Sequence, residues 1–209
     1  MGAQVSLLKK CVTNRVMFSV YQEPRVIKNF ITHEECDFLI SFENENLHKS
    51  VVLINSTQNL QSKSRKSFEK VHEHDSHEIV TTVLNKCSKI VKKPVNFFER
   101  VHTVKYKTGG YYNCHQDAIR TMPGYDRTYT IIIYLNDEYE GGETNFPLLN
   151  KSYKLSKGDA LFFHNYNTDL SYTSLSTHEA CIVKSGEKYV TNFWIHSKQR
   201  MFKVNDIKV

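Results

Sequence analysis

The sequence lacks the features of a membrane-spanning or disulfide-bonded protein. No apolar run approaches the roughly 18–20 residues that a transmembrane helix needs. The number of cysteines is odd, and neither a C-x-x-C motif nor a secretory signal accompanies them. The cysteines are Cys11, Cys36, Cys87, Cys114 and Cys181. We therefore expect reduced thiols and a cytoplasmic location.

Internal repeats, low-complexity tracts and Pro- or Ser-rich linkers are also missing, which indicates one integrated domain in the 209 residues. Hydrophobic residues make up 40% of the composition, enough to bury a sizeable core. The net charge of +6 is modest, and a solvated lysine-rich surface explains it. A nucleic-acid demethylase would need basic and aromatic residues arranged for stacking. That arrangement is not evident, so we expect no nucleic-acid partner.

The N-terminal segment, residues 1–24, begins with an acylation pattern. Gly2 and Ser6 fit M-G-x-x-x-[ST], which is typical of N-myristoylation. Myristate alone binds membranes only marginally, but the following lysines or an acyl chain on Cys11 could supply a second signal. The alternative is an ordinary, unmodified terminus. With Gly2 acylated, we would expect the protein to associate with membranes.

Glycine is scarce in the first half of the chain, and its distribution separates two segments of different composition. Seven of the eight glycines lie between Gly109 and Gly186. Residues 25–94 contain helix signals, whereas residues 95–198 contain short β-branched and aromatic runs separated by turns. We therefore predict one domain over 25–209, mostly β, in which helices support a barrel or jelly roll and a short tail follows.

Two helix starts can be placed within residues 25–94. Thr32 is followed three residues later by Glu35, which is the spacing of a capping box. A second helix is predicted to begin at Asp75, because Glu78 follows three residues later and an apolar stripe comes after it.

A candidate metal site begins with His115 and Asp117. Side chains two apart on a strand point to the same face, so both can reach one ion. A ferrous oxygenase site needs two histidines and one carboxylate, with the remaining positions open. His178, beside a later predicted strand, can supply the third ligand. Read alone, the pair could equally be incidental polar residues in a loop.

Lys188 favours the metal interpretation. It lies ten residues after His178, at the start of a strand predicted to return beside the first. A metal-bound 2-oxo acid with a distal carboxylate needs a buried cation at the far end of its pocket, and a lysine can be that cation.

A competing histidine cluster, His72, His74 and His77, lies in the sequence VHEHDSH. In isolation it looks more like a metal site than His115 and Asp117 do. Because Asp75 and Glu78 explain this stretch as a helix start, we expect these histidines to be solvated rather than ligating.

The motifs together resemble the Fe(II)/2-oxoglutarate dioxygenases, specifically the collagen-type prolyl 4-hydroxylase branch. The sequence YKTGGYYNCHQD is similar to the family pattern Y-x-x-G-G-x-Y-x-x-H-x-D. RTYTIIIYLN, EGGETNFP, KGDALFFHN, STHEACIV and GEKYVTNFWIH then follow in the family's order. VIKNFITHEECDFLI and KSRKS resemble its leading helix and Arg-x-Ser segment. The resemblance covers about residues 25–197 and implies a double-stranded β-helix core flanked by N-terminal helices.

The resemblance implies a role for each matching residue. His115, Asp117 and His178 would bind iron, while Tyr106, Thr144 and Lys188 would bind the distal carboxylate of 2-oxoglutarate. Tyr112, Arg127, Trp194 and His196 would line the groove for a proline-containing peptide or protein. Dioxygen is the co-reactant, and ascorbate is expected to support activity. The implied reaction couples decarboxylation of 2-oxoglutarate to succinate with hydroxylation of a C–H bond.

Departures from the family pattern leave alternatives open. Cys114 and Gln116 stand where the family often has proline and an aromatic residue, and Ile182 stands where it often has proline. One alternative is a hydroxylase of free amino acids or another small molecule. Another, from a different class, is a silent binding module that keeps the fold without turnover. Asp117 argues against a halogenase, which lacks this carboxylate. The oligomeric state is not indicated.

Overall fold

The computed structural model describes residues 20–43, 47–50, 52–54, 58–60, 63–118 and 126–199. The acylation pattern at Gly2, Cys11 and the predicted tail beyond residue 199 lie outside the described residues. Neither of the α-helices in the described part is long and apolar enough to span a bilayer.

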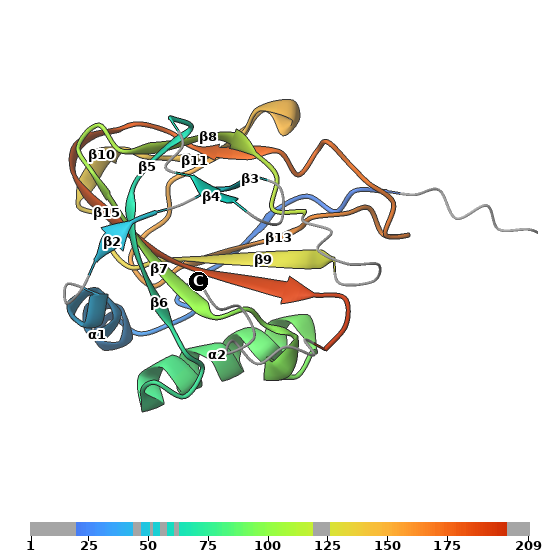
Figure 1. Cartoon of the computed structure of the whole chain (residues 1–209), viewed down its shortest axis with the longest axis horizontal. Coiled ribbons are helices and arrows are strands. Elements are labelled where there is room, and N and C mark those ends of the chain that lie inside the picture. The colour runs from blue at the N-terminus through green and yellow to red at the C-terminus, as the bar shows by residue number, and fades with distance from the viewer. Residues whose placement is uncertain are drawn as a thin grey trace, which may run out of the picture.

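The largest element of the fold is an eight-stranded antiparallel sheet, which crosses the middle of Figure 1. Its strands, in spatial order, are β1 (Arg25–Ile27), β13 (Ala160–His164), β9 (Arg127–Tyr134), β15 (Val183–His196), β7 (Val101–Lys107), β6 (Phe68–His72) and β2 (His48–Lys49). The eighth strand, β10 (Tyr139–Gly141), pairs with the first part of β15.

A smaller sheet of five strands lies above the first in Figure 1. Its order is β12 (Lys151–Tyr153), β11 (Thr144–Phe146), β14 (His178–Ala180), β8 (Tyr111–His115) and β5 (Arg65–Lys66). The remaining strands form the hairpin β3 (Val52–Ile54) and β4 (Gln58–Leu60), and two short 3₁₀ helices are η1 (Val95–Phe97) and η2 (Pro147–Leu149). The two sheets form the expected jelly roll, which confirms the predicted fold class.

Helix α1 (His33–Glu43) begins with the predicted capping box. The Thr32 N–H donates to Glu35 Oε2 at 2.8 Å, and the Glu35 N–H donates to Thr32 Oγ1 at 3.2 Å. The same carboxylate receives Lys86 Nζ from α2 at 2.7 Å, so one side chain both caps α1 and ties the two helices together.

Helix α2 (Glu78–Val91) begins three residues after the predicted start at Asp75. His77 is the N-cap, and its Nδ1 accepts the N–H of Ile79 at 3.1 Å. The sequence reading missed this start because histidine is not among the preferred capping residues.

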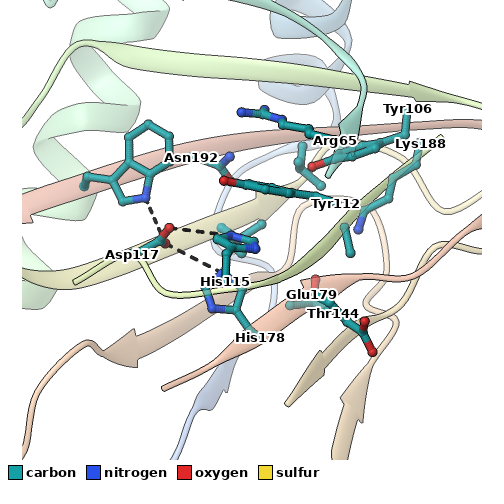
Figure 2. A pocket seen from close by; sticks show the side chains of 14 residues that line it. Arg65, Tyr106, Tyr112, His115, Asp117, Thr144, His178, Glu179, Lys188 and Asn192 are labelled. Atoms are coloured by element: carbon teal, nitrogen blue, oxygen red, sulfur yellow. Dashed lines mark hydrogen bonds and ion pairs between the residues drawn. The ribbon is translucent and has the colours of Figure 1, made fainter. Parts of the chain in front are cut away.

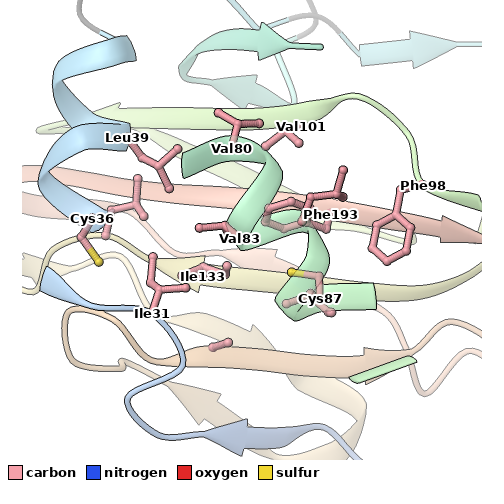
Figure 3. Packing of buried hydrophobic residues seen from close by; sticks show 14 of the residues in the cluster. Ile31, Cys36, Leu39, Val80, Val83, Cys87, Phe98, Val101, Ile133 and Phe193 are labelled. Atoms are coloured by element: carbon pink, nitrogen blue, oxygen red, sulfur yellow. The ribbon is translucent and has the colours of Figure 1, made fainter. Parts of the chain in front are cut away.

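Both faces of the large sheet are covered, and this explains the apolar runs in its central strands. Toward the helices, Ile131, Ile133 and Phe193 belong to a core that includes Leu39 and Val83 (Figure 3). On the opposite face, a second core lies between the sheets and contains Ile132, Tyr134, Phe146, Phe163 and Val190. Alternate residues of β9 and β15 therefore enter different cores.

The prediction of helical support over 25–94 was too simple. This range holds α1 and α2 but also β1, β2, β5 and β6, which extend the edges of both sheets. These strands are short and carry polar residues, as in the dipeptide Arg65–Lys66 of β5. Tertiary pairing, rather than a local pattern, fixes their conformation.

Candidate active site

The fold brings His115, Asp117 and His178 together. His115 ends β8 and His178 begins β14, and the two residues lie opposite each other in the antiparallel pairing. Asp117 lies two residues beyond the end of β8 rather than on the strand. One ligand atom from each residue lies within 4.8 Å of the other two. Within the described residues, this is the one such group of three side chains able to hold a metal ion.

Backbone carbonyls orient both imidazoles. His115 Nδ1 lies 2.8 Å from the carbonyl oxygen of Asn113, and His178 Nδ1 lies 3.0 Å from that of Ser176. With these nitrogens donating, each Nε2 is left as a lone-pair donor, at 3.7 and 3.8 Å from the Asp117 carboxylate oxygens. Two imidazoles and one carboxylate facing a common point fit the ligand set of a non-haem iron(II) centre.

Two side chains of the large sheet fix the position of the Asp117 carboxylate. Thr130 Oγ1 and Trp194 Nε1 both donate to its Oδ2 at 2.9 Å. Burial alone would raise the pKa of Asp117, but His178, His115 and the Trp194 bond bring it below its ordinary value. Burial, followed by the proximity of His178, lowers the pKa of His115 to about 3. At neutral pH the site therefore offers an ionised carboxylate and a neutral His115 imidazole, the forms that bind metal.

These residues open into a pocket of about 450 Å³, a volume that includes solvent at its mouth. Eight of the ten predicted site residues line it: Tyr106, Tyr112, His115, Asp117, Thr144, His178, Lys188 and Trp194. In Figure 2, Lys188 and Asp117 lie on opposite sides of the group of pocket-lining side chains, and the Lys188 side chain extends inward.

Lys188 is a buried cation without a carboxylate partner in the described part of the chain. Its side chain is 1% exposed, and its Nζ donates to the carbonyl oxygen of Gly142 at 2.7 Å. Burial lowers its pKa to about 8. The rings of Tyr106 and Tyr134 lie 5.5 and 5.2 Å from Nζ. An unpaired ammonium in this position fits the distal carboxylate of a bound 2-oxo diacid.

A Gly-Gly turn supports the lysine. Gly141 and Gly142 have φ angles of 69° and 68°, in the left-handed region that favours glycine. A Cβ on Gly141 would lie 2.4 Å from the carbonyl oxygen of Ile182. The turn leads into Thr144, whose Oγ1 lies 2.6 Å from the Tyr134 hydroxyl.

Tyr112 and Trp194 line the metal end of the pocket. The Tyr112 ring stacks on the His115 ring with centroids 3.6 Å apart. The Arg65 guanidinium lies over the Tyr112 ring, 4.8 Å from its centroid. Arg65 was not among the predicted site residues, although its Arg-x-Ser segment was noted. Asn192 was also missed, and its position four residues after Lys188 on β15 could have indicated it.

Arg127 and His196 are not among the residues that line the pocket. Both bind Glu99: Arg127 Nη2 lies 2.7 Å from Oε2, and His196 Nε2 lies 2.8 Å from Oε1. The Arg127 guanidinium also stacks 4.2 Å over Trp194. Burial would raise the pKa of Glu99, but Arg127 and His196 lower it strongly. Their substrate role stays a prediction, and Glu99 had no local sequence signal.

The competing histidine cluster does not form a site. His74 Nε2 binds the carbonyl oxygen of Glu99 at 2.8 Å, and His77 caps α2. His72 is 3% exposed and stacks on Phe42 with ring centroids 5.0 Å apart. The expectation that these histidines do not bind metal stays a prediction, and the expectation that they are solvated is wrong for His72.

Comparisons with known proteins point to one group. The family model of the 2OG-Fe(II) oxygenase superfamily matches residues 101–196. Prolyl 4-hydroxylase 5 of Arabidopsis thaliana is 32% identical over 200 residues, which cover 83% of this chain and 69% of the relative. A putative prolyl 4-hydroxylase of Acanthamoeba polyphaga mimivirus is 29% identical over 189 residues, or 86% and 76% of the two chains.

A solved structure is also similar. The viral collagen prolyl hydroxylase of Paramecium Bursaria Chlorella virus-1, in complex with 2OG, has a TM-score of 0.69 and 28% sequence identity. The alignment covers 84% of this chain and 96% of that chain. The residues matched by the family model include His115, Asp117, His178 and Lys188.

Proposed function

The chain belongs to the prolyl 4-hydroxylase family of 2OG-Fe(II) oxygenases, and we propose that it hydroxylates proline in a peptide or protein. It is a 2-oxoglutarate-dependent dioxygenase. When bound, iron(II) with 2-oxoglutarate and dioxygen supplies the oxidation: the cosubstrate becomes succinate and carbon dioxide, and one oxygen atom enters a substrate C–H bond. The observation that carries the proposal is the buried Lys188, which has no carboxylate partner among the described residues and lines the same pocket as His115, Asp117 and His178.

Each group of residues has a separate task. His115, Asp117 and His178 would hold the iron, with Asn113, Ser176, Thr130 and Trp194 fixing their donor atoms. Lys188 would neutralise the distal carboxylate of 2-oxoglutarate, with Tyr106 and Thr144 beside it. Ile132 and Val190 form an apolar wall that would exclude water from the pocket between Lys188 and the iron ligands.

The substrate would approach from the metal end. Tyr112 and Trp194 line that end, and aromatic side chains suit the apolar pyrrolidine ring of proline. Arg127 and His196 would act through the Glu99 network that supports Trp194. Membrane association through Gly2 and a cytoplasmic location stay predictions.

Turnover assays test this proposal. The full chain is supplied with Fe(II), 2-oxoglutarate and ascorbate, and succinate is measured with proline-rich peptides, with matched peptides carrying alanine for proline, and with free proline. Mass spectrometry locates the added oxygen. We expect succinate and hydroxyproline only with proline-containing peptides, and none with His115→Ala, Asp117→Ala or His178→Ala.

His48→Ala is the matched control, because His48 is exposed on β2 and lies outside the site. Hydroxylation of free proline instead of peptide would replace the proposal with a small-molecule hydroxylase. Binding of 2-oxoglutarate with no substrate-dependent succinate from any of these compounds would indicate a silent binding module.

A further inference from the structure

Gln116 lies between two candidate iron ligands and contacts the segment that carries the third. Its Nε2 donates to the carbonyl oxygen of Thr173 and to the hydroxyl of Thr177, both at 3.0 Å. Thr177 immediately precedes His178. We propose that Gln116 is a positioning residue that holds His178 in place relative to His115 and Asp117, and this rests on the proposed iron site.

The residues contacted by Gln116 are the turn that orients the His178 ring. Within 173–177, the Thr177 N–H donates to the carbonyl oxygen of Ser174 at 3.0 Å, and the Leu175 N–H donates to Thr173 Oγ1 at 3.2 Å. Ser176 supplies the carbonyl that binds His178 Nδ1. The Gln116 amide therefore attaches this whole turn to the His115–Asp117 segment.

Backbone pairing holds His178 from one side only. β11 pairs with Glu179 and Ala180 of the three-residue strand β14, whereas His178 is paired with β8 alone, and that pairing shifts register between His178 and Ala180. His178 is the first residue of β14 and follows the long connection 165–177, which has no strand of its own. The hydrogen bonds of Gln116 would fix the position of His178 where regular strand pairing does not.

A direct role in binding substrate is not indicated for Gln116. It is half-buried and is not among the residues that line the pocket, whereas its neighbours His115 and Asp117 are. Both hydrogen-bond donors of its amide are directed to the turn. Its effect on the reaction would therefore act through His178, and the property that should change most is the affinity for metal.

The test compares Gln116→Met with wild type in Co(II) titrations of the metal-free protein, followed by d–d absorption under anaerobic conditions. Methionine keeps the length of the side chain and removes its donors. Loss of groups that orient a metal ligand typically weakens metal affinity about 10–100-fold. We expect a shift of that size in Kd, and circular dichroism should show an intact fold.

Asn167→Leu is the matched control. Asn167 is also half-buried, and its Nδ2 donates to Ser171 Oγ at 3.0 Å and to the carbonyl oxygen of Tyr172 at 3.3 Å, within the same connection but without contacting the candidate ligands. We expect its Kd for Co(II) to equal that of wild type. Equal weakening in both variants, or a Kd for Gln116→Met within twofold of wild type, would overturn the inference.

The two proposals fail differently. If wild type binds Co(II), His178→Ala does not and Gln116→Met binds weakly, the inference stands even when no proline peptide is hydroxylated. If wild type does not bind Co(II), the iron site is wrong and the role of Gln116 is wrong with it.

Discussion

At the scale of single residues, Lys188 combines burial with a positive charge that no carboxylate in the described part of the chain neutralises. A group of this kind destabilises the free protein, because its ammonium is removed from water for one hydrogen bond to Gly142. The lowered pKa, about 8, has the same cause. A bound diacid would convert this cost into binding free energy.

Replacing Lys188 with methionine should therefore separate stability from ligand binding. We expect Lys188→Met to raise the melting temperature of the ligand-free protein by about 2–4 °C, which corresponds to ~1 kcal/mol in a chain of this size. We also expect it to lose the stabilisation that 2-oxoglutarate with Mn(II) gives wild type, about 2.7 kcal/mol at a hundredfold excess over Kd. Differential scanning fluorimetry measures both quantities.

Lys184→Met is the control, since Lys184 is exposed on the same strand. It should leave both the melting temperature and the ligand-induced shift unchanged. A Lys188→Met protein that still gains stability from 2-oxoglutarate would contradict the assignment of this lysine.

The residues of the site differ in how far the sequence predicts them. The spacing of His115 and Asp117 indicates that both can bind one metal ion. Lys188 lies ten residues after His178, a spacing that also indicated its role. Glu99 gives no such signal, because its partners are 28 and 97 residues away in the chain. A buried ion pair of that kind exists only once the strands have paired.

At the scale of elements, the capping box of α1 contributes to the attachment of the helix layer. Thr32→Ala removes the hydroxyl that accepts the Glu35 N–H, and we expect it to lower the free energy of unfolding by about 1 kcal/mol. Urea denaturation followed by circular dichroism measures the change.

Thr82→Ala is the matched variant on the exposed face of α2. It should stabilise slightly, because alanine has the higher helix propensity and Thr82 is inside a helix rather than at its cap. Loss of stability of the same size in both variants would show that the capping bond contributes nothing.

Elements with a strong local pattern were predictable and those without one were not. The run in β9 is apolar on both faces, so the amino-acid sequence alone predicts a strand there. β1 and β5 have three and two residues, too short to show a period of two. They are strands because the edges of the sheets offer them partners.

At the scale of the whole molecule, His72 makes stability depend on pH. It is buried where α1 packs on β6, its Nε2 has no partner among the described residues, and it stacks on Phe42. Burial, with Lys70 and His102 nearby, lowers its pKa to about 4. Between about pH 6.5 and 4 the unfolded chain binds a proton here that the folded chain does not, so stability falls as the pH falls.

His72→Phe should reduce that loss. We expect the decrease in unfolding free energy between pH 7 and pH 5 to be smaller by about 1 kcal/mol than in wild type, measured by urea denaturation of the metal-free protein. Some decrease should persist, because burial also lowers the pKa of His115. His48→Gln, on the exposed strand β2, should show the wild-type decrease, and an unchanged decrease in His72→Phe would refute the role of this histidine.

The alternation along β15 has a consequence for how this sequence can diverge. Lys188, Val190, Asn192 and Trp194 all face the pocket, while Tyr189 and Phe193 face the helices. One inserted or deleted residue between Lys188 and Trp194 would turn half of this series to the wrong side. Substitutions can accumulate in β15, but a change in its length would separate the cosubstrate end from the metal end. Related sequences should therefore vary in length in the connecting loops and keep a constant six-residue interval here.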